Sequence, residues 1–415
     1  MKVVRGYKTE LDLNNAQRTA CMQHAGASRF AYNWGLSRSI EVYRTTGKRP
    51  NAIALHKELN ALKQTDFPWM YAVSKCAMQE ALRDLDNAYQ RFFERVALKK
   101  AGLFKGKVGF PKFKKKSKAI GSFRLTGQIH VYEKSVKLPR IGIVRLHEKD
   151  YIPTDAKILS ATVSEEAGRW FISIQVKEEQ EKPERTATTA IGVDLGIKTL
   201  ATLSDGVTFG NPRALKHAQK KLRRLERQKS RRKKGSKNRA KTRLKLAKLH
   251  ACIANIRQDA SHKLTTYLCK NHALVAIEDL HVAGMLKNYC LAQAVSDSNF
   301  GEIRRQLEYK AEFYSTHLVM VDRWYPSSKT CSGCGYVKPE LSLGERTFVC
   351  EQCGMVLDRD LNAAINLRSV AVSSTDTKNA CGAKSAGLSD GASETVCVEA
   401  GTKEDIWTVS QMSLF

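Results

Sequence analysis

The stretch Ala190-Ile191-Gly192-Val193-Asp194 is a short apolar segment that ends on a carboxylate. Its β-branched residues predict a strand. A second run with the same character, Thr199-Leu200-Ala201-Thr202-Leu203, precedes the turn signal Ser204-Asp205-Gly206. Burying a strand that ends on a carboxylate is costly unless a cation meets the charge. We therefore start from Asp194 as a candidate functional residue.

Two further predicted segments also place acids at their ends. The apolar run 273–277 leads into Glu278 and Asp279, and a predicted helix at about 301–316 separates it from a strand at 318–321. Residues 358–368 look like a helix start and contain Asp358 and Asp360. Strand and helix signals thus follow one another on both sides of residues 327–355.

Three of these acids, Asp194, Glu278 and Asp360, could converge. Converging carboxylates repel one another and raise each other's pKa. Two divalent hard cations would relieve that repulsion, and Mg²⁺ favours carboxylate oxygens, with Mn²⁺ as a substitute. A pair of such ions is the standard device for phosphodiester cleavage. From the residues alone, Asp279 competes with Glu278 and Asp358 competes with Asp360.

A cysteine motif lies between these segments, at 327–355. Two Cys-x2-Cys pairs are separated by fifteen residues and comprise Cys331, Cys334, Cys350 and Cys353. Each pair can place two thiolates on one Zn²⁺, and two pairs close a tetrahedral site. The spacing predicts a structural zinc ribbon, and a closed shell of four thiolates leaves the zinc no position for chemistry.

The first half of the chain divides into a helical and a β-rich part. Residues 12–100 are predicted to be mostly helical, with the clearest apolar stripe at 72–94. Residues 1–11 and 101–180 are assigned to a small antiparallel β-barrel into which the helices are inserted. Ala167-Gly168 marks a hairpin in this part. The polar stretch 178–189 is the predicted domain boundary. The expected fold class is thus α+β and multidomain.

The charge of the chain indicates a polyanionic partner. The 415 residues carry a net charge of +29, which disfavours a neutral metabolic enzyme. Residues 213–248 hold 18 of the lysines and arginines with one acid, and the glycine at 235 suggests the tip of a helical hairpin. Residues 99–118 hold nine lysines with interleaved phenylalanines, as suits a nucleic acid. The candidate contacts are Lys112, Lys114, Arg223, Arg224, Arg231, Arg232, Lys233 and Lys234.

Other compositional features limit the setting of the protein. No stretch approaches the ~20 apolar residues of a membrane span, and no apolar signal region follows the N-terminus. The 11 cysteines are an odd number, which argues against a disulfide framework and for a reducing, cytoplasmic setting. Residues 371–415 are rich in Ser, Thr, Gly and Ala without apolar periodicity, so we expect a disordered tail.

Several motifs occur together in an order that resembles the TnpB family, the transposon-associated relatives of CRISPR type V effectors. They are the stretches 192–197 and 277–280, the two Cys-x2-Cys pairs, and Asp358-Arg359-Asp360-Leu361-Asn362-Ala363-Ala364. The segments 325–330 and 27–33 are also similar to the family. The resemblance covers about residues 5–368.

The resemblance implies a RuvC-like α/β nuclease domain at 190–326 and 356–370, with an RNase H-like fold, in a protein guided by RNA to double-stranded DNA. It assigns the catalytic metal ligands to Asp194, Glu278 and Asp360, and it makes Lys75 comparable to residues that approach a motif beside the target. A monomer carrying its RNA, associated with a prokaryotic nucleoid, is the expected state. The alternatives are a transposase catalysing strand transfer and a nuclease-inactive RNA-guided repressor.

Overall fold

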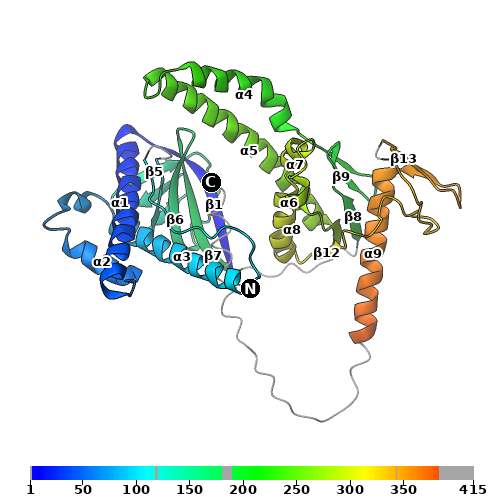
Figure 1. Ribbon diagram of the computed structural model, residues 1–415, viewed down its shortest axis with the longest axis horizontal. Coiled ribbons are helices and arrows are strands. Elements are labelled where there is room, and N and C mark those ends of the chain that lie inside the picture. Colours follow the sequence, from blue (N-terminus) through cyan, green and yellow to red (C-terminus); the bar gives the residue numbers. More distant parts are fainter. Residues whose placement is uncertain (1, 117–119, 180–188, 343, 383–415) are drawn as a thin grey trace, which may run out of the picture.

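The computed structural model describes the chain apart from residues 1, 117–119, 180–188, 343 and 383–415 (Figure 1). An N-terminal lobe combines a seven-stranded sheet with three helices, and a second lobe combines a five-stranded sheet with helices on both faces. A small two-stranded hairpin stands beside the last helix. Most of the predicted boundary at 178–189 lies outside the described residues.

The seven-stranded sheet is antiparallel throughout, with the order β2-β6-β7-β1-β5-β4-β3. Alternate residues of β7, such as Ile172, Ile174 and Val176, are fully buried, as period-two patterning requires. Ala167 and Gly168 have φ angles of 53° and 84° and form the predicted hairpin turn. The strands are β1 (Lys2–Asp12), β2 (Ser122–Leu125), β3 (His130–Tyr132), β4 (Ser135–Leu138), β5 (Gly142–Leu146), β6 (Lys157–Glu166) and β7 (Arg169–Glu179).

The predicted β-barrel is not closed. Within the described residues, β2 pairs only with β6 and β3 pairs only with β4, so these two strands are the edges of an open sheet. Helices α1 and α3 pack beside β2 and cover one face of the sheet instead (Figure 1). A hydrophobic cluster that includes Cys21 and Ala77 joins these helices to the sheet. The hydrophobic core of this lobe is therefore completed by helices packed on the sheet and not by closure of the sheet into a barrel.

Three α-helices and a short 3-10 helix follow β1. They are α1 (Asn15–Thr46), α2 (Ala52–Ala61), η1 (Pro68–Ala72) and α3 (Lys75–Lys100). Asn14 caps α1, since its side chain accepts the amide of Gln17 at 2.8 Å while the Gln17 side chain accepts the amide of Asn14. The predicted helix 72–94 is observed, but it starts at Lys75 because η1 precedes it, and it runs six residues further.

The five-stranded sheet of the second lobe has the order β10-β9-β8-β11-β12. Strand β9 is antiparallel to β8, whereas β8, β11 and β12 run parallel. Parallel strands need crossover connections, and helices supply them here. The strands are β8 (Ala190–Asp194), β9 (Thr199–Leu203), β10 (Thr208–Gly210), β11 (Leu274–Glu278) and β12 (His317–Val321).

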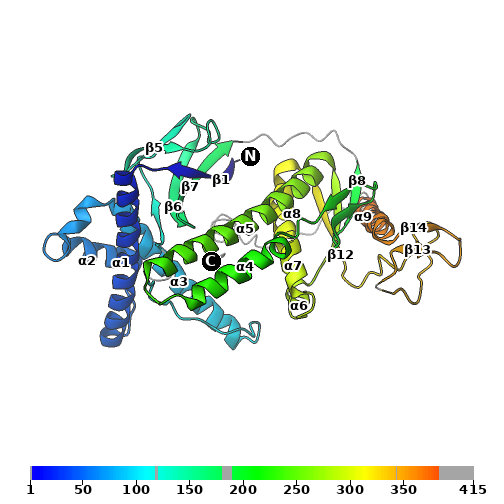
Figure 2. The same cartoon turned by 90° about the horizontal axis from the view of Figure 1, so that it is seen from above.

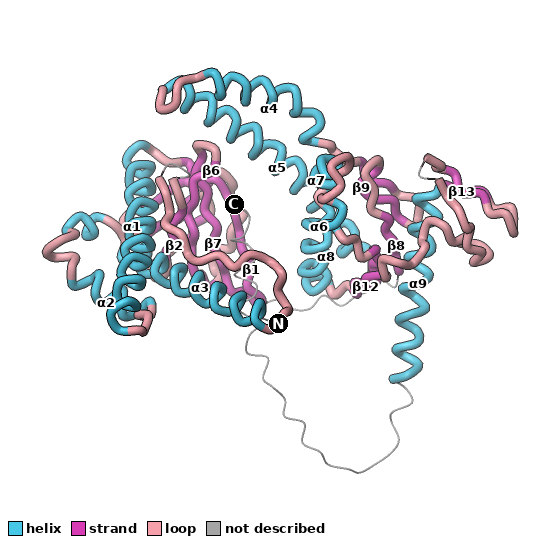
Figure 3. Tube along the Cα trace, viewed as in Figure 1, coloured by secondary structure: helices cyan, strands magenta, loops and turns pink. Residues whose placement is uncertain are grey.

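Helices lie on both faces of this sheet (Figures 1 and 2). Ile191, Val193, Val275 and Ile277 pack with α5 (Lys237–Asn271) and α8 (Phe300–Tyr314). The alternate residues belong to the opposite face, where Leu274 and Ala276 pack with α9 (Arg359–Gly382). Helix α4 (Ala214–Arg231) forms a hairpin with α5, and α6 (Val282–Met285) and α7 (Ala292–Ser298) precede α8. Figure 3 separates the helices from the strands of both lobes by colour.

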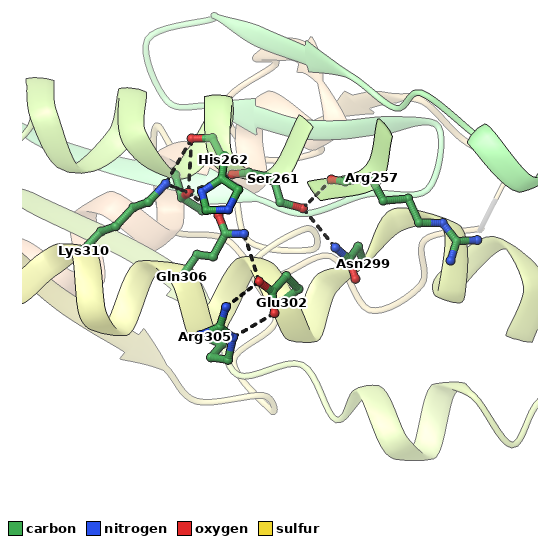
Figure 4. A network of polar contacts seen from close by, with 9 residues as sticks. Arg257, Ser261, His262, Asn299, Glu302, Arg305, Gln306 and Lys310 are labelled. Carbon is green, nitrogen blue, oxygen red and sulfur yellow. Dashed lines mark hydrogen bonds and ion pairs between the residues drawn. The ribbon is translucent and has the colours of Figure 1, made fainter. Parts of the chain in front are cut away.

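A buried polar network fixes α8 on α5 (Figure 4). The Oγ1 atom of Thr265 donates to the side-chain oxygen of Gln306 at 2.8 Å. The Lys310 ammonium donates to the hydroxyl oxygens of Thr265 and Thr266 at 2.7 and 2.8 Å. Burial lowers the pKa of Lys310 to about 8. Because buried polar groups need partners, this network specifies one registration of the two helices.

The last helix corrects the predicted start of the tail. Helix α9 continues to Gly382, past the predicted boundary at residue 370. Ala371 is fully buried against the cluster of Leu274 and Val321, so docking on the sheet holds a segment whose composition lacks a clear apolar period. Residues 383–415 of the predicted tail lie outside the described part. Within the described residues, no helix has the length and apolarity needed to cross a bilayer.

Candidate active site and metal centre

Strands β8 and β11 place two of the predicted carboxylates side by side. Ile277 pairs with Val193 in parallel register, and Glu278 and Asp194 are the next residues of the two strands. Successive side chains of a strand point to opposite faces. Val193 and Ile277 face α5 and α8, so Asp194 and Glu278 both face α9.

Helix α9 brings Asp360 to the same face. Asp360 lies in the first turn of α9. The helix packs closely on β8 because Gly192 has no side chain. A Cβ atom on Gly192 would stand 2.0 Å from the carbonyl oxygen of Ala364 and 2.6 Å from the amide nitrogen of Arg368. The glycine of the opening motif therefore sets the distance between β8 and the helix that carries Asp360.

Electrostatics connects the three acids. The pKa of Asp194 is raised to about 7, chiefly by burial; the charges of Asp360 and Glu278 add to the rise and that of Arg359 opposes it. Burial also raises the pKa of Glu278, with Asp279 contributing. Such a cluster resists full ionisation in the absence of cations. The donor set therefore fits hard divalent metal ions.

The two competing acids have partners of their own, as does Asp360, whose carboxylate lies 3.5 Å from Arg359 and 3.8 Å from Arg346. Hydrogen bonds from Arg323 and Arg304 hold the pKa of Asp279 below its usual range, and both arginines form ion pairs with it. The Oδ1 atom of Asp358 accepts the amides of Asp360 and Leu361 at 2.9 and 3.1 Å, as a helix cap does. Asp279 and Asp358 thus have structural partners.

The four cysteines form the tightest ligand cluster. Among the described residues they are the one group whose candidate metal-binding atoms all lie within 4.8 Å of one another, so the three carboxylates are more widely spaced. The Sγ atoms of Cys331 and Cys353 are 3.6 Å apart, and those of Cys334 and Cys350 are 3.5 Å apart. A tetrahedral site with Zn–S bonds of about 2.3 Å has S–S edges of about 3.8 Å. The thiols are therefore spaced for one zinc ion.

The two cysteine turns have matching geometry. The amide of Cys331 donates to the Tyr336 carbonyl at 2.8 Å, and the amide of Cys350 donates to the Met355 carbonyl at 2.9 Å. Each turn closes on a glycine with positive φ, 78° at Gly335 and 72° at the equivalent position of the second turn. The second turn joins β13 (Thr347–Val349) to β14 (Val356–Asp358), which leads directly into α9.

Two buried asparagines of α9 bind the first cysteine turn. The side chain of Asn362 accepts the Ser332 amide at 3.0 Å and donates to the Thr330 carbonyl at 2.7 Å. Asn366 donates to the carbonyls of Ser327 and Thr330 at 2.8 and 2.7 Å. The cysteine cluster is therefore connected to the helix that positions Asp360.

The most basic segment forms the predicted helical hairpin. Its tip includes Gly235, whose φ is 85°, between α4 and α5. The side chain of Arg232 is used inside the hairpin, because it donates to the Asn238 carbonyl and the Thr242 hydroxyl. The remaining predicted contacts of this segment are exposed, namely Arg223, Arg224, Arg231, Lys233 and Lys234.

A buried acid that sequence reasoning missed fixes this hairpin. The carboxylate of Asp297, in α7, accepts the amides of Leu215 and Lys216 at 2.9 and 3.1 Å and the Nε–H of Arg257 at 3.0 Å. It therefore stabilises the first turn of α4 from a distant element. No local signal marks Asp297, because its partners lie forty or more residues away.

The predicted contacts of the N-terminal lobe differ in their environment. Lys75 is exposed at the start of α3, and Lys112 is exposed in the loop after α3. Lys114 is held in place, because its backbone forms two hydrogen bonds with the Asn33 amide and its ammonium lies 4.1 Å from the centroid of the Tyr32 ring. The structure thus gives Lys114 a role in attaching the basic loop to α1.

Three family models match the chain. One described as "Probable transposase" matches residues 173–289, and one described as "Cas12f1-like, TNB domain" matches residues 300–367. A model described as "Helix-turn-helix domain" matches residues 1–48, where the described residues form β1 and the single helix α1. The two larger matches cover β8, β11 and the whole cysteine region together with Asp360.

Relatives match almost the whole chain. A protein of Streptomyces pristinaespiralis named "Putative RNA-guided DNA endonuclease" is 34% identical over 92% of this chain and 92% of its own. The Escherichia coli K12 protein named "Putative RNA-guided DNA endonuclease InsQ" is 32% identical over 88% of this chain and 92% of its own. The chain therefore belongs to the TnpB-like family of RNA-guided DNA endonucleases, as the sequence motifs predict.

A solved structure shows the same overall fold. The Cas12f1 chain in a structure titled "Cryo-EM structure of the Cas12f1-sgRNA-target DNA complex" matches with a TM-score of 0.52 at 12% identity. The match covers 88% of this chain and 99% of that chain. The arrangement of the two lobes is thus shared with an effector protein of very different sequence.

Proposed function

We propose that this protein is an RNA-guided, metal-dependent DNA endonuclease. The observation that carries the proposal is the placement of Asp194, Glu278 and Asp360 on one face of the five-stranded sheet. The names of the nearly full-length relatives support the same activity. Guide RNA and double-stranded DNA are the proposed partners, and sequence choice comes from base pairing with the guide.

The second lobe is the nuclease domain, with an RNase H-like arrangement of its strands. Asp194, whose pKa is raised by burial and by the charges of Asp360 and Glu278, would hold two Mg²⁺ ions together with these two acids. When bound, such a pair of ions activates water and stabilises the leaving oxygen in phosphodiester cleavage. The chain itself contributes ionised carboxylates at fixed positions, and Arg359 offsets part of their repulsion.

The four cysteines hold a structural Zn²⁺ ion. Their spacing and the two matching turns fit a site closed by four thiolates. In this proposal the zinc stabilises the hairpin that precedes α9, and the asparagines at 362 and 366 connect that hairpin to the helix.

The exposed face of the basic hairpin binds nucleic-acid backbone. Removing one side chain that neutralises a phosphate should flatten the slope of log K against log salt by about 0.7–0.9. Substituting Arg223, Arg224, Lys233 and Lys234 by glutamine should therefore reduce the slope, whereas Arg232→Gln should mainly loosen the hairpin tip. Fluorescence anisotropy of labelled RNA measures the slope. An unchanged slope in the variant with all four substitutions would mean that these side chains face solvent and do not contact the nucleic acid.

A cleavage experiment separates this function from its alternatives. The purified protein–RNA complex is incubated with labelled target DNA and Mg²⁺, and the products are resolved as cut, joined or merely bound. We expect cut DNA. Joined products would support a transposase, and binding without cutting would support a repressor. Asp360→Ala should abolish cutting while leaving DNA binding within a few fold.

A further inference from the structure

Trp324 has an unusual environment for a large apolar side chain. It is 84% exposed, whereas Trp170 is 3% exposed and Trp69 is 44% exposed. Tryptophan is generally well buried in folded proteins, because its indole buries a large apolar area. Nothing in the packing of the described residues accounts for the exposure of Trp324. The planar indole is therefore available to a partner outside the chain.

Trp324 stands at the edge of the sheet that carries the candidate active site. Val321, the last residue of β12, pairs with Glu278 in parallel register. The amide of Asp279 donates to the Val321 carbonyl at 3.0 Å. The next side chain before Trp324, that of Arg323, forms an ion pair with Asp279. The indole is thus attached to a segment that contacts the neighbour of a proposed metal ligand.

The turn that presents Trp324 is fixed on both sides. The Oδ1 atom of Asp322 accepts the Trp324 amide at 2.8 Å. Tyr325 packs on the cluster formed by the sheet and α9. The carbonyl of Ser327 accepts a hydrogen bond from the buried Asn366 at 2.8 Å. The backbone is therefore already ordered, so binding a partner at the indole has a small entropic cost.

We propose that Trp324 is a positioning residue on which an unpaired base of the DNA strand stacks beside the scissile phosphate. This inference rests on the proposed nuclease function. A planar indole accepts any base, as suits an enzyme whose sequence choice comes from a guide. Stacking on one side of the phosphate restrains the strand relative to Asp194, Glu278 and Asp360. Arg323 stays paired with Asp279 and supports the turn.

The first test combines substitution of Trp324 with removal of single DNA bases, in the manner of a double-mutant cycle. Single-turnover cleavage is measured for wild type, Trp324→Ala and Trp324→Phe, on DNA with single abasic positions around the mapped cut. Stacking energies predict a fall of roughly tenfold for Trp324→Ala and a smaller fall for Trp324→Phe. At one abasic position the wild type should fall to the rate of Trp324→Ala, and Trp324→Ala should fall no further. Equal losses in both proteins at every position would overturn the proposal.

The second test does not depend on cleavage. The inactive Asp194→Ala protein is assembled with RNA and DNA that carries 5-iodouracil near the cut, and irradiation should cross-link the base to the peptide that contains Trp324. Cross-links confined to other peptides would overturn the proposal. Tyr132→Ala, at an exposed tyrosine of the other sheet, is the control for loss of an aromatic side chain, and it should retain the wild-type rate. If the wild-type complex binds DNA but never cuts it, the nuclease function fails, while the cross-link still decides the contact of Trp324.

Discussion

Replacing Gly192 by alanine tests the close contact between β8 and α9. The new Cβ atom would meet the Ala364 carbonyl oxygen at 2.0 Å, and ordinary van der Waals contact begins at 3.4 Å. The helix would therefore have to move back by about 1.4 Å, because the obstructing atoms belong to its backbone and cannot rotate away. Asp360 would move with the helix, away from Asp194.

The expected effects are large on both stability and activity. Overpacking of a tight core costs typically 1–3 kcal/mol, and a backbone clash belongs at the upper end. At about 2–4 °C per kcal/mol for a domain of this size, the melting temperature should fall by roughly 6–12 °C. A misplacement of about 1 Å in a catalytic group can lower the rate by about a hundredfold. Cleavage should therefore fall by about that factor at a temperature where the protein is folded.

Gly210→Ala is the matched control, because Gly210 is also a strand glycine of the same sheet and its added Cβ would meet nothing within 4 Å. Differential scanning fluorimetry gives the melting temperatures, and single-turnover cleavage at saturating Mg²⁺ gives the rates. A Gly192→Ala protein with a wild-type melting temperature and a rate within twofold of wild type would refute the reasoning.

Three further predictions concern the acids and the cysteines. Asp358→Ala should lower the free energy of unfolding by about 1 kcal/mol, through loss of the α9 cap, yet retain far more cleavage than loss of Asp360; denaturant titration and cleavage rates check this. Cys350→Ser should reduce both bound zinc and cleavage, whereas Cys252→Ser, at an exposed thiol, should change neither; full cleavage by a zinc-free Cys350→Ser protein would contradict the coupling to α9. Because the folded pKa of Asp194 is raised from 3.8 to about 7, its protonation contributes stability that is complete below pH 3.8 and is lost as pH rises through about 7. Without Mg²⁺, Asp194→Asn should therefore flatten the fall in melting temperature between pH 5 and 8, and a profile identical to wild type would count against the raised pKa.

The sequence predicted the parts of the fold that local patterns determine. The strands around Asp194 and Glu278 follow from short β-branched runs, and the turn at Ala167-Gly168 follows from residues that accept positive φ. The hairpin tip at Gly235 follows for the same reason. These predictions depend on neighbouring residues only, and the structure confirms them.

The features of the fold that the sequence analysis did not predict depend on contacts between distant segments. Closure of the first sheet would need β2 and β3 to meet, and no local pattern decides whether edge strands pair. The extension of α9 through Ala371 depends on its docking against the sheet. The shared face of Asp194 and Glu278, by contrast, follows from their positions in β8 and β11 and from the period-two alternation of strands, whereas the choice of Asp360 came from the family resemblance.

The late position of α9 has a consequence for synthesis of the protein on the ribosome. The sheet face around Leu274 and Val321 stays uncovered until α9 has emerged, because the helix follows the whole four-cysteine segment. At 5–20 residues per second, translating the chain from Val321 to Ala371 takes roughly 3–10 s. During that time the nascent chain already carries its basic hairpin but lacks Asp360. Under the roles proposed for the hairpin and for Asp360, the nascent protein meets RNA before it can cut DNA, and cutting begins only when nearly all of the described fold has been made.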